Sequence, residues 1–216
     1  MNGKCFRNSL GALILVLGLC SVSCAQEAAG TPRGPAPAVY ENKAAGVTIT
    51  CPAGWFMKEW VSEKQPPAIT ERSSGVIFSL QPPGQPQQNN VQMQLSCFAA
   101  PISFDLDHPL DSEHYSGVKG LLQFCNGIVN GLVNAADRTY SLTQKPALFT
   151  LNGADGIWFA YDVALKKATG QDSFTFAEYH FLYKKSWVFI MCVAGKENYK
   201  AHEKEIQSSI NSLRFQ

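Results

Sequence analysis

The pattern of apolar and polar positions divides most of the chain into short runs that are typical of β-strands. In the first half, alternating runs rich in β-branched and aromatic residues are separated by turn residues, which predicts four strands. In the second half, further runs rich in aromatic and branched residues predict about four more strands with at least one well-buried face. The predicted strands cover residues 46–51, 55–61, 75–81, 91–98, 147–151, 157–164, 174–184 and 187–193.

Residues that favour turns mark the connections between these strands. Pro52-Ala-Gly54 predicts a turn between the first two strands. The third and fourth strands are expected to form a hairpin whose connector, residues 82–90, is polar and hostile to helix. Asn152-Gly-Ala-Asp-Gly156 supplies residues that tolerate positive φ, and it predicts a link between two later strands.

Two segments switch to helical spacing. Apolar residues recur every three or four positions between Asp111 and Asn134, with Asp111 as a suitable N-cap. Three glycines inside this helix each cost about 1 kcal/mol relative to alanine. They are Gly120, Gly127 and Gly131. Either the helix packs closely on a neighbour through them or it is broken, and we favour close packing against a sheet.

The second helix is expected over Asn198 to Phe215, and it is amphipathic. Its apolar face carries Ile206, Ile210 and Leu213. The residues predicted to be solvated are Lys200, Glu203, Lys204 and Gln207. Runs of strands separated by helices, in the order ββββ-α-ββββ-α, predict an α+β fold with an antiparallel sheet.

Residues 1–25 have the organisation of an export signal. Lys4 and Arg7 form a basic start, and Leu10 to Leu19 is an apolar run about half as long as a membrane span requires. Cleavage after Ala25 would release a secreted protein, whereas cleavage before Cys24 would leave that cysteine as a lipidated N-terminus. Either route predicts an exported chain, in the periplasm or anchored as a lipoprotein to the bacterial envelope.

The predicted leader also sets the domain organisation and the charge of the remainder. Residues 26–39, rich in Ala, Gly and Pro, are expected to form a flexible tether, and residues 40–216 a single domain of ordinary size. Without the leader the chain carries 16 Lys and Arg against 17 Asp and Glu, because Lys4 and Arg7 are lost with it. A near-neutral domain with no basic run argues against a nucleic-acid partner and against a polybasic membrane surface.

Four of the seven cysteines remain whichever cleavage occurs. In an oxidising compartment they permit two disulfides in three pairings, and the alternative is that they are small buried hydrophobic residues. The disulfide candidates are Cys51, Cys97, Cys125 and Cys192. Their spacing does not suggest a structural zinc site.

One dense group of polar residues precedes the first helix. Asp105, Asp107, His108 and His114 are candidate ligands for a divalent cation, and oxygen ligands favour Ca²⁺ or Mn²⁺ over zinc. The alternative is a helix N-terminus with capping acids and solvated histidines. This second interpretation needs no bound metal, and no cofactor is expected.

The sequence contains no catalytic motif that we can identify. No GxSxG, P-loop or GxGxxG is present. His180, between two aromatic residues of a predicted strand, is expected to be a packed or surface residue. All four tryptophans fall in predicted strands, where some could line a binding face. They are Trp55, Trp60, Trp158 and Trp187.

Short motifs in a particular order give the chain a resemblance to a known superfamily. They are Tyr40-Glu-Asn42, Gly46-Val-Thr-Ile-Thr-Cys-Pro-Ala-Gly-Trp55, Leu151-Asn-Gly-Ala-Asp-Gly156 and Ile210-Asn-Ser-Leu-Arg-Phe215. In these motifs and their spacing the chain resembles the PsbP-like superfamily, which includes PsbP proteins of photosystem II, Ran-binding Mog proteins and exported DcrB-like bacterial proteins. The resemblance implies an α/β/α sandwich over residues 40–216 and transfers no activity.

Export, the tether and the lack of a catalytic motif together favour a non-enzymatic accessory domain. We expect it to bind another envelope protein and to contact membrane only through an N-terminal lipid anchor. The alternative is a periplasmic protein that binds a small ligand or a divalent metal.

Overall fold

Two antiparallel sheets and two helices make up the described part of the computed structural model. The structure describes residues 37–62, 73–81, 90–99, 117–133, 139–167, 170–184 and 186–216. The larger sheet has seven strands in the order β3-β4-β5-β9-β8-β7-β6. Its strands are β3 (Phe56–Ser62), β4 (Ser73–Ser79), β5 (Gln92–Ala99), β6 (Thr139–Leu151), β7 (Ala154–Lys167), β8 (Gly170–Tyr183) and β9 (Ser186–Gly195).

The smaller sheet joins the two ends of the described chain. β2 (Val47–Thr50) lies between β1 (Val39–Asn42) and β10 (Arg214–Phe215), and both neighbours pair with it in antiparallel register. Asn42 on β1 donates a hydrogen bond of 2.9 Å to the Ser74 hydroxyl on β4, which ties the small sheet to the large one. The two ends of the fold are therefore held beside each other.

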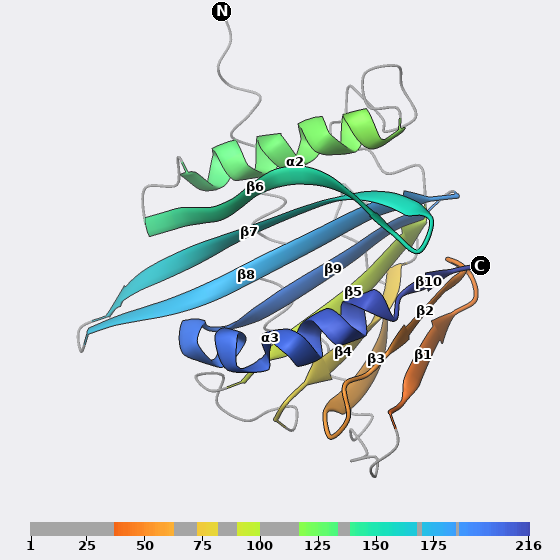
Figure 1. Cartoon of the computed structure of the whole chain (residues 1–216), viewed down its shortest axis with the longest axis horizontal. Helices are drawn as coiled ribbons and strands as arrows, with labels where there is room; N and C mark the ends of the chain where they lie inside the picture. The colour runs from red at the N-terminus through yellow and green to blue at the C-terminus, as the bar shows by residue number, and fades with distance from the viewer. Residues whose placement is uncertain are drawn as a thin grey trace, which may run out of the picture.

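The helices lie on opposite faces of the large sheet. α2 (Gly117–Val133) packs on β6, β7 and β8, while α3 (Lys196–Asn211) packs on β8, β9 and β2. Figure 1 shows α2 running along β6, and α3 leading directly into β10 beside β2. The chain thus forms the α/β/α arrangement that its pattern and its resemblance predicted. Among the described helices, none combines the length and apolar character that a membrane span requires.

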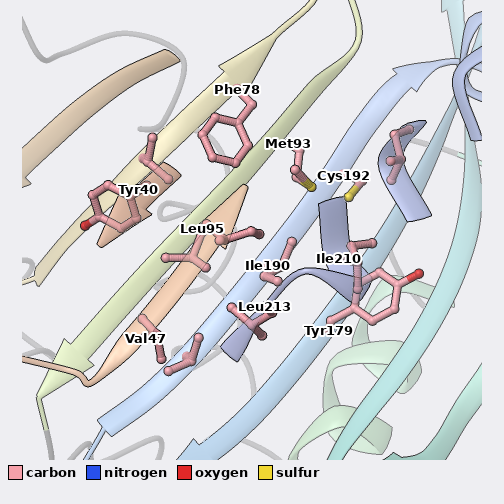
Figure 2. Close-up of a cluster of buried hydrophobic side chains, with 14 of the residues drawn as sticks. Tyr40, Val47, Phe78, Met93, Leu95, Tyr179, Ile190, Cys192, Ile210 and Leu213 are labelled. Atoms are coloured by element: carbon pink, nitrogen blue, oxygen red, sulfur yellow. The ribbon is translucent and has the colours of Figure 1, made fainter. Parts of the chain in front are cut away.

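Alternation along the strands assigns side chains to the two faces. On β8, Ala177, Tyr179 and Phe181 join the α3-side core, which Figure 2 shows in close-up. That core also contains Leu95 of β5 and Ile190 of β9. On the other face, Leu121 and Cys125 of α2 pack against strand residues including Ile157 and Phe159.

Several expected elements have different bounds in the structure. β1 and β10 were not predicted as strands, and β10 occupies residues assigned to the end of the last helix. β6 begins at Thr139, eight residues before its predicted start. The first half of this strand was missed because it has only two large apolar residues, Tyr140 and Leu142, among polar ones. The Pro52–Gly54 turn is present, but it connects strands of two different sheets. The predicted cap Asp111 lies outside the described residues.

The explanation given for the helix glycines is wrong at Gly127. A Cβ added there would meet nothing within 4 Å, so close packing does not require glycine at this position. Gly75 is the opposite case, because its Cβ would lie 2.0 Å from the Leu95 carbonyl oxygen on the neighbouring strand. Close approach of backbones therefore demands glycine in the sheet rather than at Gly127 of the helix.

Candidate functional site

A half-open groove lies between α3 and the strands β6, β7 and β8. Its volume is about 480 Å³, within the range of small-molecule sites. Strand residues form its floor and one face of α3 forms its wall. The lining residues are Thr143, Gln144, Phe149, Thr150, Leu151, Trp158, Ala160, Thr175, Tyr179, Tyr199, Glu203, Gln207, Ile210 and Asn211.

Aromatic rings dominate the floor. Trp158 on β7 and Tyr179 on β8 are direct register partners, and their rings stack with centroids 5.9 Å apart and planes 11° apart. Phe149 on β6 meets the Tyr179 ring edge-to-face at 5.8 Å. In Figure 2 the hydroxyl of Tyr179 points away from the labelled core residues. The sheet thus presents a continuous aromatic surface with a polar group at its edge.

Gly156 on β7 makes room for this aromatic floor. A Cβ at this position would lie 2.7 Å from a ring carbon of Phe181 and 2.9 Å from one of Phe149. The Asn152–Gly156 motif was interpreted as a turn, and the turn is present at Asn152 and Gly153, both of which have positive φ. Gly156 itself is a strand residue whose missing side chain lets two rings approach.

The wall of the groove comes from one stripe of α3. Tyr199, Glu203, Gln207 and Ile210 recur at intervals of three or four residues, so they share one helix face. Ile210 is buried in the core, Tyr199 is half-buried, and Glu203 and Gln207 are exposed. The stripe therefore grades from apolar at the base to polar at the rim.

Glu203 is the one charged side chain among the described residues of the lining. Burial, followed by the charges of neighbours that include Glu203, raises the pKa of the Tyr179 and Tyr199 phenols. Both hydroxyls therefore stay protonated at neutral pH and can donate hydrogen bonds to a ligand. Within the described ranges, no hydrogen bond already occupies either hydroxyl.

An ion pair lies next to one lining residue of the groove. Asp162 accepts a hydrogen bond of 2.7 Å from Lys196 and another of 2.7 Å from the hydroxyl of Thr175, a lining residue. The charges of Asp162 and Lys196 thus neutralise each other at the edge. The electrostatic character of the groove is set by Glu203 and the aromatic faces.

A second polar group is buried on the opposite face of the sheet. Tyr161 donates a hydrogen bond of 2.8 Å to Glu178, whose other oxygen lies 3.1 Å from His180 Nε2. Glu178 and His180 are 2% and 1% exposed. The His180 ring stacks on Phe159 at 5.5 Å and lies 4.8 Å from Phe189, and its Nδ1 has no partner among the described residues. His180 was expected to be a packed or a surface residue, and its burial among aromatic rings shows the packed alternative.

The predicted metal ligands and the lipidation site fall outside the described residues. These are Asp105, Asp107, His108, His114 and Cys24. Within the described ranges, no group of three or more His, Cys, Asp or Glu side chains is placed to hold a metal ion.

The four candidate disulfide cysteines are described, and all are free and buried. Cys51, Cys97 and Cys192 belong to the α3-side core, whereas Cys125 lies under α2 on the other face. Two disulfides would require Cys125 to reach across the sheet. Cys97 and Cys192 are also offset, because Cys192 pairs with Met93, about 13 Å along β5 from Cys97. The disulfide candidates are therefore not confirmed, and the buried-hydrophobe alternative fits the packing.

Of the four tryptophans, Trp158 alone lines the groove. Trp55 is buried and donates a hydrogen bond of 3.0 Å to Glu205 of α3. Trp60 lies on the edge strand β3, and Trp187 is buried on the α2 side with Phe98. Trp158 is therefore the one tryptophan of the four that is placed to contact a ligand in this groove.

Sequence reasoning missed the residues that complete the groove. Glu203 and Gln207 were predicted to be solvated, which is correct, but their alignment with Tyr199 was not used. That helical spacing was a readable signal. The pairing of Trp158 with Tyr179 had no comparable signal, since it depends on the strand register.

Comparisons with known proteins bear on the fold. No family model matches the sequence, and no curated protein matches it. The structure is similar to the solution structure of cyanobacterial PsbP (CyanoP) from Synechocystis sp. PCC 6803, with a TM-score of 0.53 and 13% identity over 90% of this chain and 98% of that one.

Two further structures are similar at a lower level. One is LpqN, involved in cell envelope biogenesis of Mycobacterium tuberculosis, with a TM-score of 0.40 and 14% identity over 73% of this chain and 83% of that one. The other, from Bacteroides thetaiotaomicron VPI-5482, has a TM-score of 0.43 and 12% identity over 82% of this chain and 48% of that one. The similarity to CyanoP, together with the antiparallel sheet between two helices, shows that this chain has the PsbP-like α+β fold.

Proposed function

We propose that this chain is an exported, non-enzymatic accessory domain of the bacterial envelope that acts by binding a ligand in the α3 groove. The observation that carries the proposal is the groove itself, about 480 Å³ in volume and floored by the stacked pair Trp158 and Tyr179. Aromatic surfaces with a few polar groups at the rim are typical of ligand sites. The groove volume favours the small-ligand alternative over a protein partner.

The polar groups of the groove support binding rather than catalysis. Proton transfer in catalysis commonly uses a positioned acid–base side chain, most often histidine, or a pair of carboxylates. The described lining contains one carboxylate, Glu203. Of the two described histidines, His180 is buried beneath α2, and His202 lies outside the lining and contacts Glu205. Turnover of a bound compound would contradict this part of the proposal.

A ligand screen with a groove-filled variant tests the binding site. Saturation-transfer NMR would compare the full chain with Ala160→Trp, which places an indole in the groove, and with Ala201→Trp, which places the same indole on an exposed position of α3. We expect polar metabolites or short peptides that bind the parent chain and Ala201→Trp but not Ala160→Trp. Thr175→Trp is a second filling variant, and thermal melts confirm that each variant folds.

Two results would refute the site. One is a screen in which no compound binds the parent chain, and the other is a set of ligands that bind Ala160→Trp and Thr175→Trp as well as the parent. An affinity pull-down separately tests the expected protein partner in the envelope. A partner retained by the groove-filled variants would assign protein binding to another surface.

The export part of the proposal has its own test. The intact mass of the chain recovered after expression with its leader reports the cleavage position and any acyl chains. A mass starting at Gln26 supports plain secretion, and an acylated mass starting at Cys24 supports a lipoprotein. A mass that retains residues 1–25 would contradict export by this signal.

A further inference from the structure

We infer that the occupant of the groove is a small, freely diffusing organic cation with an alkylammonium group. This inference rests on the proposed binding function and names the ligand class. It follows from two independent properties of the lining, its charge and its aromatic surface.

The charge of the lining is complementary to a cation. Among the described residues, Glu203 is the one ionic side chain of the lining, and none of the others there is Lys, Arg or His. Asp162 and Lys196 at the edge are paired with each other, and the exposed Lys200 and Lys204 are on α3 but outside the lining. An anionic ligand would meet Glu203 with no compensating positive charge, so the groove disfavours it.

The aromatic surface adds a second attraction for a cation. Trp158 is half-buried in the floor, Tyr199 is half-buried in the wall, and Tyr179 lies beside Trp158. The faces of such rings carry negative potential and attract cations within about 6 Å of the centroid, Trp most strongly. The remaining polar lining consists of hydroxyl and amide groups, whose oxygens are also hydrogen-bond acceptors.

The same lining argues against an inorganic cation. Ca²⁺ takes about six to eight oxygen ligands, often from several carboxylates, whereas one carboxylate and an aromatic floor are available here. An alkylammonium group is different, because its carbon atoms pack on rings while its charge is spread over the whole group. The volume of about 480 Å³ accommodates such a molecule without any change of the sheet.

The test compares a cation with a neutral molecule of the same shape. Choline and its uncharged carbon isostere, 3,3-dimethylbutan-1-ol, would be titrated into the ¹⁵N-labelled full chain while the indole N–H signal of Trp158 is followed. Trp158→Phe assigns that signal. We expect choline to shift it and the isostere to bind at least about tenfold more weakly.

A matched pair of helix variants locates the charge. Glu203→Gln should weaken choline binding about three- to tenfold and leave binding of the isostere unchanged. Glu205→Gln removes the same charge two residues away, at a side chain that contacts Trp55 and His202 outside the groove, and should have no effect. Equal binding of choline and its isostere, or equal effects of the two variants, would overturn the inference.

The failures of this inference and of the proposed function can be told apart. If neither probe shifts Trp158 but neutral compounds from the ligand screen do, the cation inference is wrong and the groove remains a binding site. If choline binds Ala160→Trp as well as the parent chain, the groove is not its site and the cation inference falls, whereas the proposed function falls only if the ligands of the screen also bind the groove-filled variants. If the chain sediments with phosphatidylcholine vesicles but does not respond to free choline, the ligand is a lipid headgroup. That result would overturn the inference of a freely diffusing cation.

Discussion

The buried pair Tyr161 and Glu178 gives the most direct test of how the sheet is stabilised under α2. The Tyr161 hydroxyl donates a 2.8 Å hydrogen bond to Glu178, and both residues are at most 3% exposed. Tyr161→Phe keeps the ring that stacks on Phe176 at 5.2 Å and removes only the donor. Glu178 is then left with one oxygen that has lost its donor in a buried site.

The expected cost follows from the burial of that carboxyl group. A hydrogen bond contributes about 0.5–1.5 kcal/mol net, and an unsatisfied buried polar atom costs about 1–3 kcal/mol. We therefore expect Tyr161→Phe to lower the free energy of unfolding by about 2 kcal/mol. For a chain of this size that corresponds to a fall in Tm of about 4–8 °C.

Urea unfolding followed by tryptophan fluorescence measures this loss. The midpoint should fall while the slope m stays unchanged, because the folded surface is the same. Tyr140→Phe is the matched control. Tyr140 lies beside Tyr161 with ring centroids 6.1 Å apart, is only half-buried, and should change stability by less than about 0.5 kcal/mol.

A double-mutant cycle decides whether the effect belongs to this hydrogen bond. Glu178→Gln replaces the carboxyl acceptor by an amide and alters the bond, so Tyr161→Phe should cost less in that background, with a coupling energy of about 0.5–2 kcal/mol. Strictly additive effects, or equal losses in Tyr161→Phe and Tyr140→Phe, would refute the reasoning.

Three further predictions concern glycine, cysteine and pH. Gly75→Ala should destabilise the chain by about 3 kcal/mol in thermal or urea unfolding, because its Cβ would strike the Leu95 carbonyl oxygen. Gly127→Ala should instead stabilise the chain by about 0.5–1 kcal/mol. A similar change in stability for both variants would contradict the packing. The four described cysteines are buried and free, so iodoacetamide should label them, as counted by mass spectrometry, only after unfolding. Burial raises the pKa of Cys51 from 9.0 to about 11 and that of Cys97 to about 12. Since the unfolded chain releases these protons first, the free energy of unfolding should fall as pH rises from about 9 towards 12, and a rise in urea midpoints over that range would contradict the assignment.

The sequence carried enough information for most of the fold because its signals are local. Turn residues next to alternating runs predicted the β4–β5 hairpin and the turn after β6, and helical spacing predicted α2 and α3. β1 and β10 were missed because strands of four and two residues carry no periodic signal. β10 is also stabilised by pairing with β2 from the other end of the described chain, which no local pattern reveals. The pairing of β2 with β10 also explains why the last helix ends at Asn211 rather than near Phe215.

The groove was harder to foresee because its residues come from four elements. Phe149, Trp158, Tyr179 and Tyr199 lie on β6, β7, β8 and α3, and they meet only through strand register and helix docking. An aromatic residue in a strand can equally belong to a buried core, as Phe159 does next to Trp158 on β7. Glu203 has the sequence context of any solvated helix residue. Its charge becomes relevant to ligand binding only because the aromatic residues of the sheet lie opposite it in the structure.

The groove exists because α3 is too short and too firmly fixed to cover the strands beneath it. β7 and β8 have 14 residues each and span about 46 Å, whereas the 16 residues of α3 span about 24 Å.

The C-terminal end of α3 is held in place by two neighbouring segments. Ser209 and Ser212 hydrogen-bond the backbone of Thr50 on β2, and the Asn152 side chain donates to the carbonyl oxygens of Asn211 and Leu213. The fully buried residues of the helix are Ile206, Ser209 and Ile210, whereas its first half contacts the core through the half-buried Tyr199 and leaves Glu203 exposed beside the groove.

Because α3 is fixed at its C-terminal end and the strands beneath it are paired, the groove needs no rearrangement to accept a ligand. This lowers the entropic cost of binding. The Asn152 turn, which looked purely structural in the sequence, therefore also helps to fix α3 beside the groove, because it links the end of the β6–β7 hairpin to the end of α3.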